Sequence, residues 1–352
     1  HMSSLIHYRT RDGEFQDFQG KVRQSLWNSQ VSLEGPLVKE SVSFLALARR
    51  NTFDWTNPLN DDQFPVTFDT DLKVTAKIDR KNHLSYTSIY ARNNTGVNPL
   101  TLADDFQAEE GVLVQGLQWE TVSEKGLFSK LNLLYNRARV DMEEQSGNFF
   151  TRFTQNDLSL REDVFYETER GRKLRAGASL EYQGVNGEEF NFYQNPEIPI
   201  GALSSVFWDR SLDAQILRAG AYAIAEGKLR FRIRYHAGVR TDFNLRNGKA
   251  RVSPRLSLNR WLFKRVWLNL SSGLYYQDPR PHLVQQFPEL TPSRSHQHSA
   301  GLIYRPGRRW RFFGEAYLKD YRNLVIFDSR QNFSNQGEGR VQGVEFKVEY
   351  HR

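Results

Sequence analysis

In its second half the chain reads Leu229-Arg230-Phe231-Arg232-Ile233-Arg234-Tyr235-His236-Ala237-Gly238-Val239, with apolar and polar residues in alternation. Successive side chains of a β-strand point to opposite faces, so as a strand this segment has one apolar face and one strongly basic face. Three arginines buried in a soluble sandwich would be prohibitively unfavourable. If the apolar face lies in lipid and the basic face in water, that burial is avoided. The pattern therefore predicts a strand of a transmembrane β-barrel.

Composition permits this location and excludes some others. The chain has 352 residues, a net charge of +7, 13% aromatic residues and a mean hydropathy of −0.64. A barrel strand needs only every second residue apolar, so a polar average is compatible with a membrane. No apolar run approaches the roughly 20 residues of a membrane helix. The basic residues are dispersed along the chain, which argues against a nucleic-acid partner, and with no cysteine there is neither a disulfide nor a thiolate metal site.

The alternation recurs along most of the chain, and the predicted connections alternate in length. Val66–Ile78 alternates almost perfectly, turns at Asp79–Asn82 and returns over Leu84–Tyr90. Short turns are predicted near Val38–Glu40, Asp79–Asn82, Glu124–Gly126, Thr168–Arg172, Glu226–Lys228, Phe263-Lys264 and Pro306–Arg309. Longer loops fall between them, as expected for outer-membrane barrels with short periplasmic turns and long extracellular loops. We predict an all-β antiparallel transmembrane barrel with about 16 strands.

Three segments are less regular. Val42–Ala48 is apolar at both sets of alternate positions. Arg251–Leu258 contains Pro254, which cannot donate to a ladder and is expected at a bulge or strand start. Ser204–Arg218 has a weak helical periodicity.

An ordered series of motifs resembles TonB-dependent outer-membrane receptors, especially the Bacteroidetes-type receptors. The first, Ser3–Arg9 followed by Asp12-Gly13, is similar to that family's passage from plug to barrel. The others are Leu33-Glu34-Gly35-Pro36-Leu37-Val38-Lys39 with Ser43-Phe44-Leu45 and Arg49-Arg50, then Ala237–Asp242, Ser253–Leu258, Gly273–Pro279, Glu315–Tyr321 and Gly339–Glu345. The resemblance lies in the ordered succession of these motifs over nearly the whole chain.

The resemblance implies a residual plug-to-barrel segment over residues 1–16 and a β-barrel domain over 17–352. The family's barrels usually have 22 strands, so this barrel is expected to be incomplete, lacking the plug and the last strands. Implied partners are outer-membrane lipid, the TonB complex acting through a plug absent from this chain, and an unknown small-molecule, glycan or peptide ligand. A surface lipoprotein is a further candidate partner. The implied location is the cell outer membrane.

Enzymatic and metal chemistry have little support in the sequence. Gly-x-Ser-x-Gly, Gly-x-x-x-x-Gly-Lys and His-Glu-x-x-His are all absent, so no cofactor and no catalytic residue is predicted. Asp61-Asp62 and Asp104-Asp105 lie in predicted outer loops and could bind Ca²⁺, although solvated loop acids are the simpler interpretation. His296 and His298 share one face of a predicted strand, which could form half a metal site. Two ordinary polar-face histidines are the simpler interpretation, and no metal site is predicted.

Ligand contacts are predicted in the outer loops and the lumen. The loop aromatics that could stack on a ligand are Trp55, Tyr193, Phe207 and Trp208. Alternatively, these rings pack within their loops or in an interfacial belt. Arg230, Arg232 and Arg234 are predicted to face the lumen, where they could attract an anion or pair with lumen acids.

The function predicted from the resemblance is the first of the three that follow, and the other two are alternatives. The first is a TonB-dependent transport receptor that binds a ligand at its outer loops and lumen before energised import. The second is a passive, porin-like or structural barrel within a larger outer-membrane complex. The third is a soluble all-β binding module.

Overall fold

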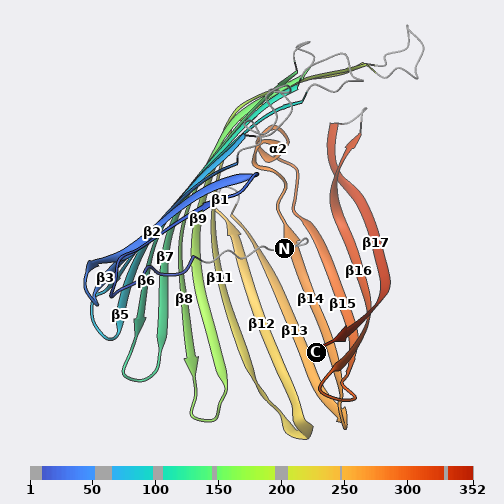
Figure 1. The fold of residues 1–352 in the computed structure, drawn as a ribbon. Coiled ribbons are helices and arrows are strands. Elements are labelled where there is room, and N and C mark those ends of the chain that lie inside the picture. Colours follow the sequence, from blue (N-terminus) through green and yellow to red (C-terminus); the bar gives the residue numbers. More distant parts are fainter. Residues whose placement is uncertain are drawn as a thin grey trace.

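The computed structural model describes residues 10–51, 66–97, 106–144, 149–194, 205–245, 248–328 and 332–351. Their seventeen strands form one antiparallel sheet that curves strongly around a hollow (Figure 1). The predicted all-β antiparallel barrel fold is confirmed. The first nine strands are β1 (Gln19–Gln24), β2 (Asn28–Val38), β3 (Val42–Asn51), β4 (Val66–Lys77), β5 (Asn82–Val97), β6 (Phe106–Val122), β7 (Phe128–Glu144), β8 (Phe149–Glu167) and β9 (Lys173–Gln194).

The remaining strands continue the series toward the C-terminus. They are β10 (Ser205–Ser211), β11 (Ala214–Lys228), β12 (Ile233–Asn244), β13 (Lys249–Phe263), β14 (Val266–Gln277), β15 (Ser293–Tyr304), β16 (Trp310–Asp328) and β17 (Asn332–Tyr350). Nearly every strand pairs with the next strand in sequence. The exception is β10, which pairs with the far end of β9, while the near end of β9 pairs with β11. With β10 set apart, sixteen described strands form the curved wall, close to the predicted number.

Connections at one end of the wall are short, as predicted. Turns of a few residues join β2 to β3, β4 to β5, β6 to β7, β8 to β9, β13 to β14 and β15 to β16. At the other end longer intervals separate the strands, including 52–65 between β3 and β4 and 278–292 between β14 and β15. We call these the short-turn end and the long-loop end. In an outer-membrane barrel they are the periplasmic and extracellular ends respectively.

The segment with the clearest alternation contains a turn, so the prediction of one continuous strand there is wrong. Arg230–Arg232 form a single 3₁₀ turn between β11 and β12. Phe231 has φ 60° and Arg232 has φ 58°, the left-handed region that bulky side chains rarely adopt. The short turn predicted near Glu226–Lys228 is present but lies directly after these residues, which end β11.

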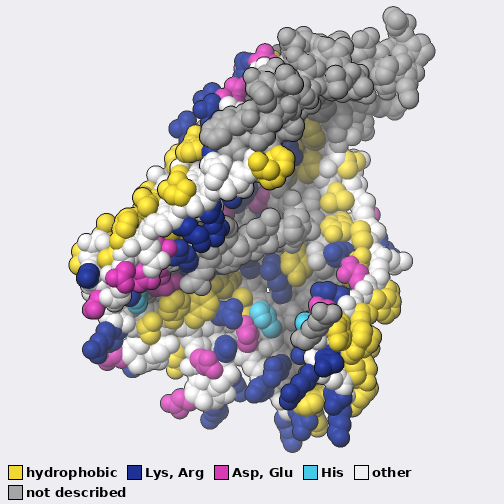
Figure 2. Space-filling model, in the orientation of Figure 1, with side chains coloured by type: hydrophobic (Ala, Val, Ile, Leu, Met, Phe, Trp, Pro, Cys, Tyr) yellow, Lys and Arg dark blue, Asp and Glu magenta, His cyan; other side chains and the backbone are white. Residues whose placement is uncertain are grey.

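Within β12 the alternation does sort side chains between two faces. Val239 and Phe243 belong to the apolar set, and both are exposed. The other set is polar and includes Arg234, Arg240 and Asp242. Figure 2 shows Lys, Arg, Asp and Glu side chains gathered in the hollow of the curved sheet, with hydrophobic side chains along its outside. We call these the inner and outer faces.

Aromatic rings mark the outer face at the short-turn end. Trp310 lies against Phe312 and Tyr350, with ring centroids 6.0 and 4.8 Å apart. Tyr304 stacks on Phe312 at 6.1 Å. Farther along β17 the outer face is apolar, and Phe346 is 84% exposed. Aromatic girdles beside an exposed apolar band are typical of barrels in contact with lipid.

The N-terminal segment before β1 lies against the inner face. Asp12 forms an ion pair with Lys73 at 2.6 Å and accepts a hydrogen bond from Thr75 Oγ1 at 2.9 Å. Gly13 packs so closely on β3 that a Cβ would lie 2.0 Å from the carbonyl oxygen of Phe44 and 3.1 Å from the nitrogen of Leu45. This contact explains why β3 is apolar on both faces: Leu45 points inward and is buried.

Two irregular segments differ from their predictions. Pro254 lies within β13 opposite Val239, where the β12–β13 register is continuous, so it marks neither a bulge nor a strand start. Instead it lies next to Arg255, the residue at which the pairing of β13 with β14 ends. The weak helical periodicity of Ser204–Arg218 is misleading, because its described residues lie mainly in β10 and β11.

Helix is scarce in the described chain. The helix α2 (Pro281–Gln286) has six residues and lies in the long interval between β14 and β15 (Figure 1). None of the helices in the described ranges is long and apolar enough to cross a membrane.

A charge on the outer face should destabilise the barrel far more than the same charge on the inner face. Leu270 is 42% exposed on the outer face of β14, a few residues above the short-turn end. We expect Leu270→Arg to reduce the free energy of unfolding by about 2–4 kcal/mol, because it places a charge in the apolar band. Urea unfolding in lipid vesicles measures this. The adjacent inner-face variant Asn269→Arg should lose much less, and equal losses would contradict the facial assignment.

The turn between β4 and β5 should be sensitive to acid. Asp79 accepts hydrogen bonds from the Asn82 side chain at 2.8 Å, from Lys81 N at 2.6 Å and from Asn82 N at 2.8 Å. The Asn82 amide and these backbone donors hold the pKa of Asp79 below its usual 3.8. A lowered folded-state pKa adds stability above the ordinary value, and that stability disappears as the pH falls through the folded value.

The measurement compares unfolding midpoints of the natural chain and Asp79→Asn from neutral pH down to below pH 3.8. The difference between the two proteins should be constant at neutral pH and shrink in acid. The matched variant Glu169→Gln, in the short turn between β8 and β9, should not reproduce this trend. A pH-independent difference for Asp79→Asn would contradict the assignment.

Candidate ligand-binding wall of the barrel

Of the three arginines predicted to line the lumen, the structure places one on a strand. Arg234 is an exposed residue of β12 in register with the inner-face residue Asn259. Arg230 and Arg232 lie in the turn at the short-turn end, so their predicted place on a lumen wall is wrong. The guanidinium of Arg232 lies 5.5 Å from the ring of Trp261.

The predicted loop aromatics are only partly within the described chain. Trp55 lies outside the described residues. Tyr193 lies on β9, and Phe207 and Trp208 lie on β10. The backbones of β9 and β10 pair with Tyr193 opposite Val206, which brings three of the four predicted positions into one hairpin at the long-loop end.

A different set of arginines lines the inner wall. Arg161, Arg175, Arg240 and Arg255 come from β8, β9, β12 and β13 and border one cavity of about 360 Å³. They share it with the polar side chains of Asp163, Tyr222, His236 and Ser253. We call this the arginine cavity. Guanidinium groups on one concave surface favour oxyanions such as carboxylates and phosphates.

One carboxylate organises one side of the arginine cavity. Asp163 is 8% exposed and accepts a bidentate contact from Arg161, with Nε 3.0 and 2.9 Å from its two oxygens. The hydroxyl of Tyr222 donates a hydrogen bond to Asp163 Oδ1 at 2.5 Å. Arg161 also lies 5.7 Å from the Tyr222 ring. These contacts fix the guanidinium of Arg161 in place before any ligand arrives.

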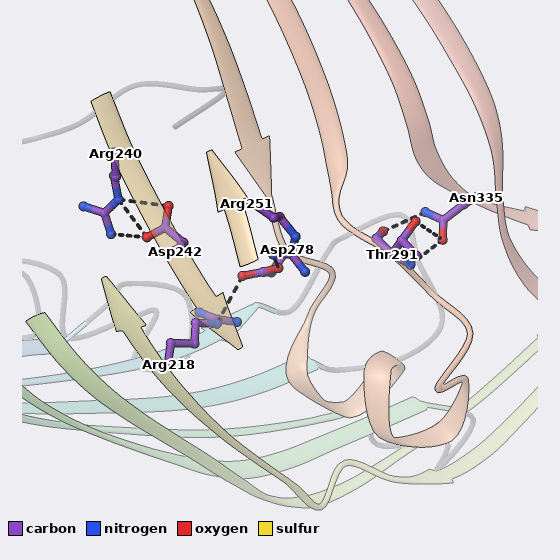
Figure 3. Close-up of polar contacts among 7 residues, drawn as sticks. All are labelled: Arg218, Arg240, Asp242, Arg251, Asp278, Thr291 and Asn335. Carbon is purple, nitrogen blue, oxygen red and sulfur yellow. Dashed lines mark hydrogen bonds and ion pairs between the residues drawn. The ribbon is translucent and has the colours of Figure 1, made fainter. Parts of the chain in front are cut away.

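The other arginines of the cavity differ in how far their charge is compensated. Arg240 contacts Asp242 through Nε at 2.8 Å (Figure 3). Arg175 lies 3.2 Å from the carboxylate of Glu226. Arg255 packs on the ring of Tyr275 at 4.4 Å and has no carboxylate partner among the described residues. The cavity therefore keeps an excess of positive charge at Arg255.

A second cluster closes the long-loop end of the same wall. Asp278, the first residue after β14, contacts Arg251 at 2.5 Å and Arg218 at 3.1 Å (Figure 3). Like charges on Arg218 and Arg251 would repel, and the shared carboxylate neutralises part of that repulsion. The contact holds residues 278–292 to the wall.

Apolar packing and amide hydrogen bonds hold residues 278–292 at further points. Leu283 and Leu290 of the segment are buried, and α2 packs against β9 and β11. Gln286 Nε2 donates to the carbonyl of Ser211 at 2.8 Å. At its far end Thr291 N donates to Asn335 Oδ1 at 2.6 Å, and Asn335 Nδ2 donates back to Thr291 O at 2.9 Å (Figure 3). The segment is therefore a built part of the wall rather than an unattached loop.

Sequence reasoning missed these residues although a signal was present. Both ion pairs follow the spacing Arg-x-Asp, as Arg161-Glu162-Asp163 and Arg240-Thr241-Asp242. Residues two apart on a strand share a face, so this spacing places opposite charges side by side. The Arg-x-Asp spacing therefore predicts an ion pair on one face of a strand. The prediction of lumen arginines instead used the Arg-x-Arg-x-Arg run, whose first residues form a turn.

The metal candidates gain no support among the described residues. His296 and His298 do share a face, with ring centroids 4.2 Å apart, but it is the outer face. Within the described ranges no three His, Cys, Asp or Glu side chains gather as metal ligands. Asp61-Asp62 and Asp104-Asp105 lie outside the described residues.

Comparison with known proteins supports the fold and defines the family. The model of the TonB dependent receptor-like β-barrel family matches residues 11–351. The chain is therefore an outer-membrane receptor barrel and belongs to the TonB-dependent receptor β-barrel family. This is a family of outer-membrane transport receptors rather than enzymes, and the soluble-module alternative is excluded. No curated protein matches the sequence.

Solved structures agree in fold at low sequence identity. A mutant of the ferric enterobactin receptor PfeA of Pseudomonas aeruginosa is 14% identical with a TM-score of 0.68, covering 94% of this chain and 58% of that protein. The copper transporter OprC is 13% identical with a TM-score of 0.69, covering 98% and 61%. The alcaligin receptor FauA of Bordetella pertussis is 12% identical with a TM-score of 0.62, covering 97% and 59%. The chain thus spans about 60% of the length of these proteins.

Removal of the Asp278 carboxylate should release residues 278–292 from the wall. We expect Asp278→Asn to weaken this attachment by about 1–3 kcal/mol, because both arginines lose a charged acceptor. The chain has no cysteine, so a spin label on Gln285→Cys reports the segment alone. Its spectrum should show faster motion in the variant. Glu289→Gln, in the same segment, is the matched control and should leave the spectrum unchanged, and an unchanged spectrum for Asp278→Asn would contradict the anchoring role.

Proposed function

We propose that this chain is the barrel of a TonB-dependent receptor that takes up an anionic ligand through its lumen. The observation that carries the proposal is the arginine cavity, in which Arg161 and Arg240 are held in place and Arg255 keeps uncompensated charge. A fixed guanidinium loses little freedom on binding, so it contributes most of its interaction to affinity. Ligand capture at the outer loops precedes transfer to this wall, and Trp55, Tyr193, Phe207 and Trp208 are the proposed aromatic contacts there.

Import is proposed to be energised by TonB acting through the plug that receptors of this family carry. The segment up to residue 16 is proposed as the passage from plug to barrel, supported by its ion pair from Asp12 to Lys73 on the inner wall. The motif series supports a Bacteroidetes-type receptor, for which a surface lipoprotein is a proposed partner.

The proposed ligand class is an anionic metal chelate. Two considerations support it: guanidinium groups suit carboxylate and other anionic oxygens, and PfeA, similar in fold, is a ferric enterobactin receptor. A passive or structural barrel would not require arginines that are fixed in place, so the arginine cavity favours the receptor function.

The test is binding of ferric enterobactin to the detergent-solubilised chain, followed by tryptophan fluorescence. Replacing Arg240 and Arg255 by Gln should weaken binding by about tenfold or more, since each contact to a charged oxygen contributes roughly 1.5–3 kcal/mol. The matched control, Arg260→Gln with Arg308→Gln, removes two exposed arginines near the short-turn end and should bind normally. Absence of binding by the natural chain, or equal binding by all three proteins, would refute the proposal.

A further inference from the structure

Basic residues also gather on the outer face, where a barrel meets lipid. Arg294, Arg322 and Arg340 lie on β15, β16 and β17 and border one hollow of about 720 Å³. Asp320 and His296 border the same hollow. We call this the outer arginine hollow. Arg255 borders both this hollow and the arginine cavity. The strand registers place Arg294, Arg322 and Arg340 on the face opposite to that of Arg161 and Arg240.

The outward direction of these side chains follows from the strand registers. Arg294 lies opposite Arg322, and Asp320 lies opposite both His296 and Arg340. Along β15 these positions continue the parity of Leu302 and Tyr304, which are exposed on the apolar outer face. The intervening residues Ser293 and Ser295 are buried on the inner side.

The height of the hollow matches the far boundary of the apolar band. Arg294 is ten residues from Tyr304, about 34 Å along the strand at roughly 3.4 Å per residue. With a strand tilt of roughly 35–45° this corresponds to about 24–28 Å across the membrane, and the apolar band of such barrels is about 25 Å tall. Tyr304 lies in the aromatic group at the short-turn end. The hollow therefore lies at the headgroup level of the outer leaflet.

The charges in the hollow are incompletely paired. Arg340 forms an ion pair with Asp320 at 2.6 Å. Arg294 and Arg322 are exposed, and neither has an acidic partner within the described ranges. Like charges directly opposite each other on adjacent strands are destabilising, and at a lipid boundary water screens them less than in solution. An anion between the two guanidinium groups removes this repulsion.

The floor of the hollow is apolar and suits the acyl chain of a lipid. Pro254, Leu256 and Leu274 line the side formed by β13 and β14. Tyr276 lies opposite Arg294 in the register, which places an aromatic residue beside the charges, as is common at membrane interfaces. An apolar floor beside two free guanidinium groups fits an acyl chain with an attached phosphate.

We propose that the outer arginine hollow binds the phosphorylated headgroup of an outer-leaflet lipid, with Arg294 and Arg322 as the phosphate contacts. Arg340 is already paired with Asp320, so it is not one of the proposed phosphate contacts. The lipid belongs to the membrane rather than to the transported ligand, and its proposed phosphate contacts are not among the residues substituted in the test of import.

The test is native mass spectrometry of the whole chain with lipid A, with the same lipid after removal of its phosphates, and with inorganic phosphate alone. Phosphorylated lipid A should bind, and Arg294→Gln with Arg322→Gln should weaken it by about tenfold or more. Asp320→Asn should strengthen it, because it removes a repelling charge and frees Arg340. The matched control Arg260→Gln with Arg308→Gln should bind as the natural chain does.

Three outcomes would overturn the proposal. They are equal binding of the dephosphorylated lipid, retention of lipid by the Arg294/Arg322 double variant, and binding of inorganic phosphate with no added contribution from the lipid. Folding of each variant is checked by its heat-dependent migration on gels. Should the double variant not fold, the single variants Arg294→Gln and Arg322→Gln replace it, and each should weaken lipid A binding.

Discussion

The hydrogen-bonded ladder between neighbouring strands is the constraint on which this molecule depends. The hydrocarbon region of a membrane offers no water, so each backbone N–H and C=O of a spanning segment must find its partner in the adjacent strand. In this chain a meander of antiparallel pairs meets that demand through long, mostly continuous registers such as β7–β8 and β8–β9. Once the ladder is formed, the pleat sends alternate side chains to lipid and lumen.

The lumen face can therefore hold charges that a soluble core could not. Asp163 is nearly buried, yet its oxygens are satisfied by Arg161 and Tyr222. Asp278 forms ion pairs with Arg218 and Arg251 and also fixes the segment that follows β14. The same physical rule explains the proposed binding function, since arginines already held by carboxylates need little reorganisation to meet an anion.

The sequence predicts the fold class well, because alternation and loop length are both direct consequences of a membrane sheet. Val66–Ile78 and its turn at Asp79–Asn82 occur almost as predicted. The turn at Arg230–Arg232 could not be predicted in the same way. Phe231 and Arg232 adopt positive φ without a glycine or asparagine to signal it, and the alternation of residue types continues through the turn.

The candidate site was less predictable, because it depends on which strands become neighbours. Arg161, Arg175, Arg240 and Arg255 are far apart in sequence and meet only because β9 pairs with β11 past the β10 hairpin. Arg294 and Arg322 likewise meet only through one register of β15 with β16. Spacing within a strand is visible in a sequence, whereas register between strands is set by turns and by packing.

The most direct measurement of the central claim is a nitroxide scan along β15 in lipid bilayers, made possible by the absence of native cysteine. Labels at residues 293–304 are compared for collisions with oxygen, which concentrates in lipid, and with a water-soluble nickel chelate. The two accessibilities should alternate with a period of two, with oxygen highest at positions 300, 302 and 304. An absent period, or oxygen maxima at 299, 301 and 303, would contradict the assignment of outer and inner faces.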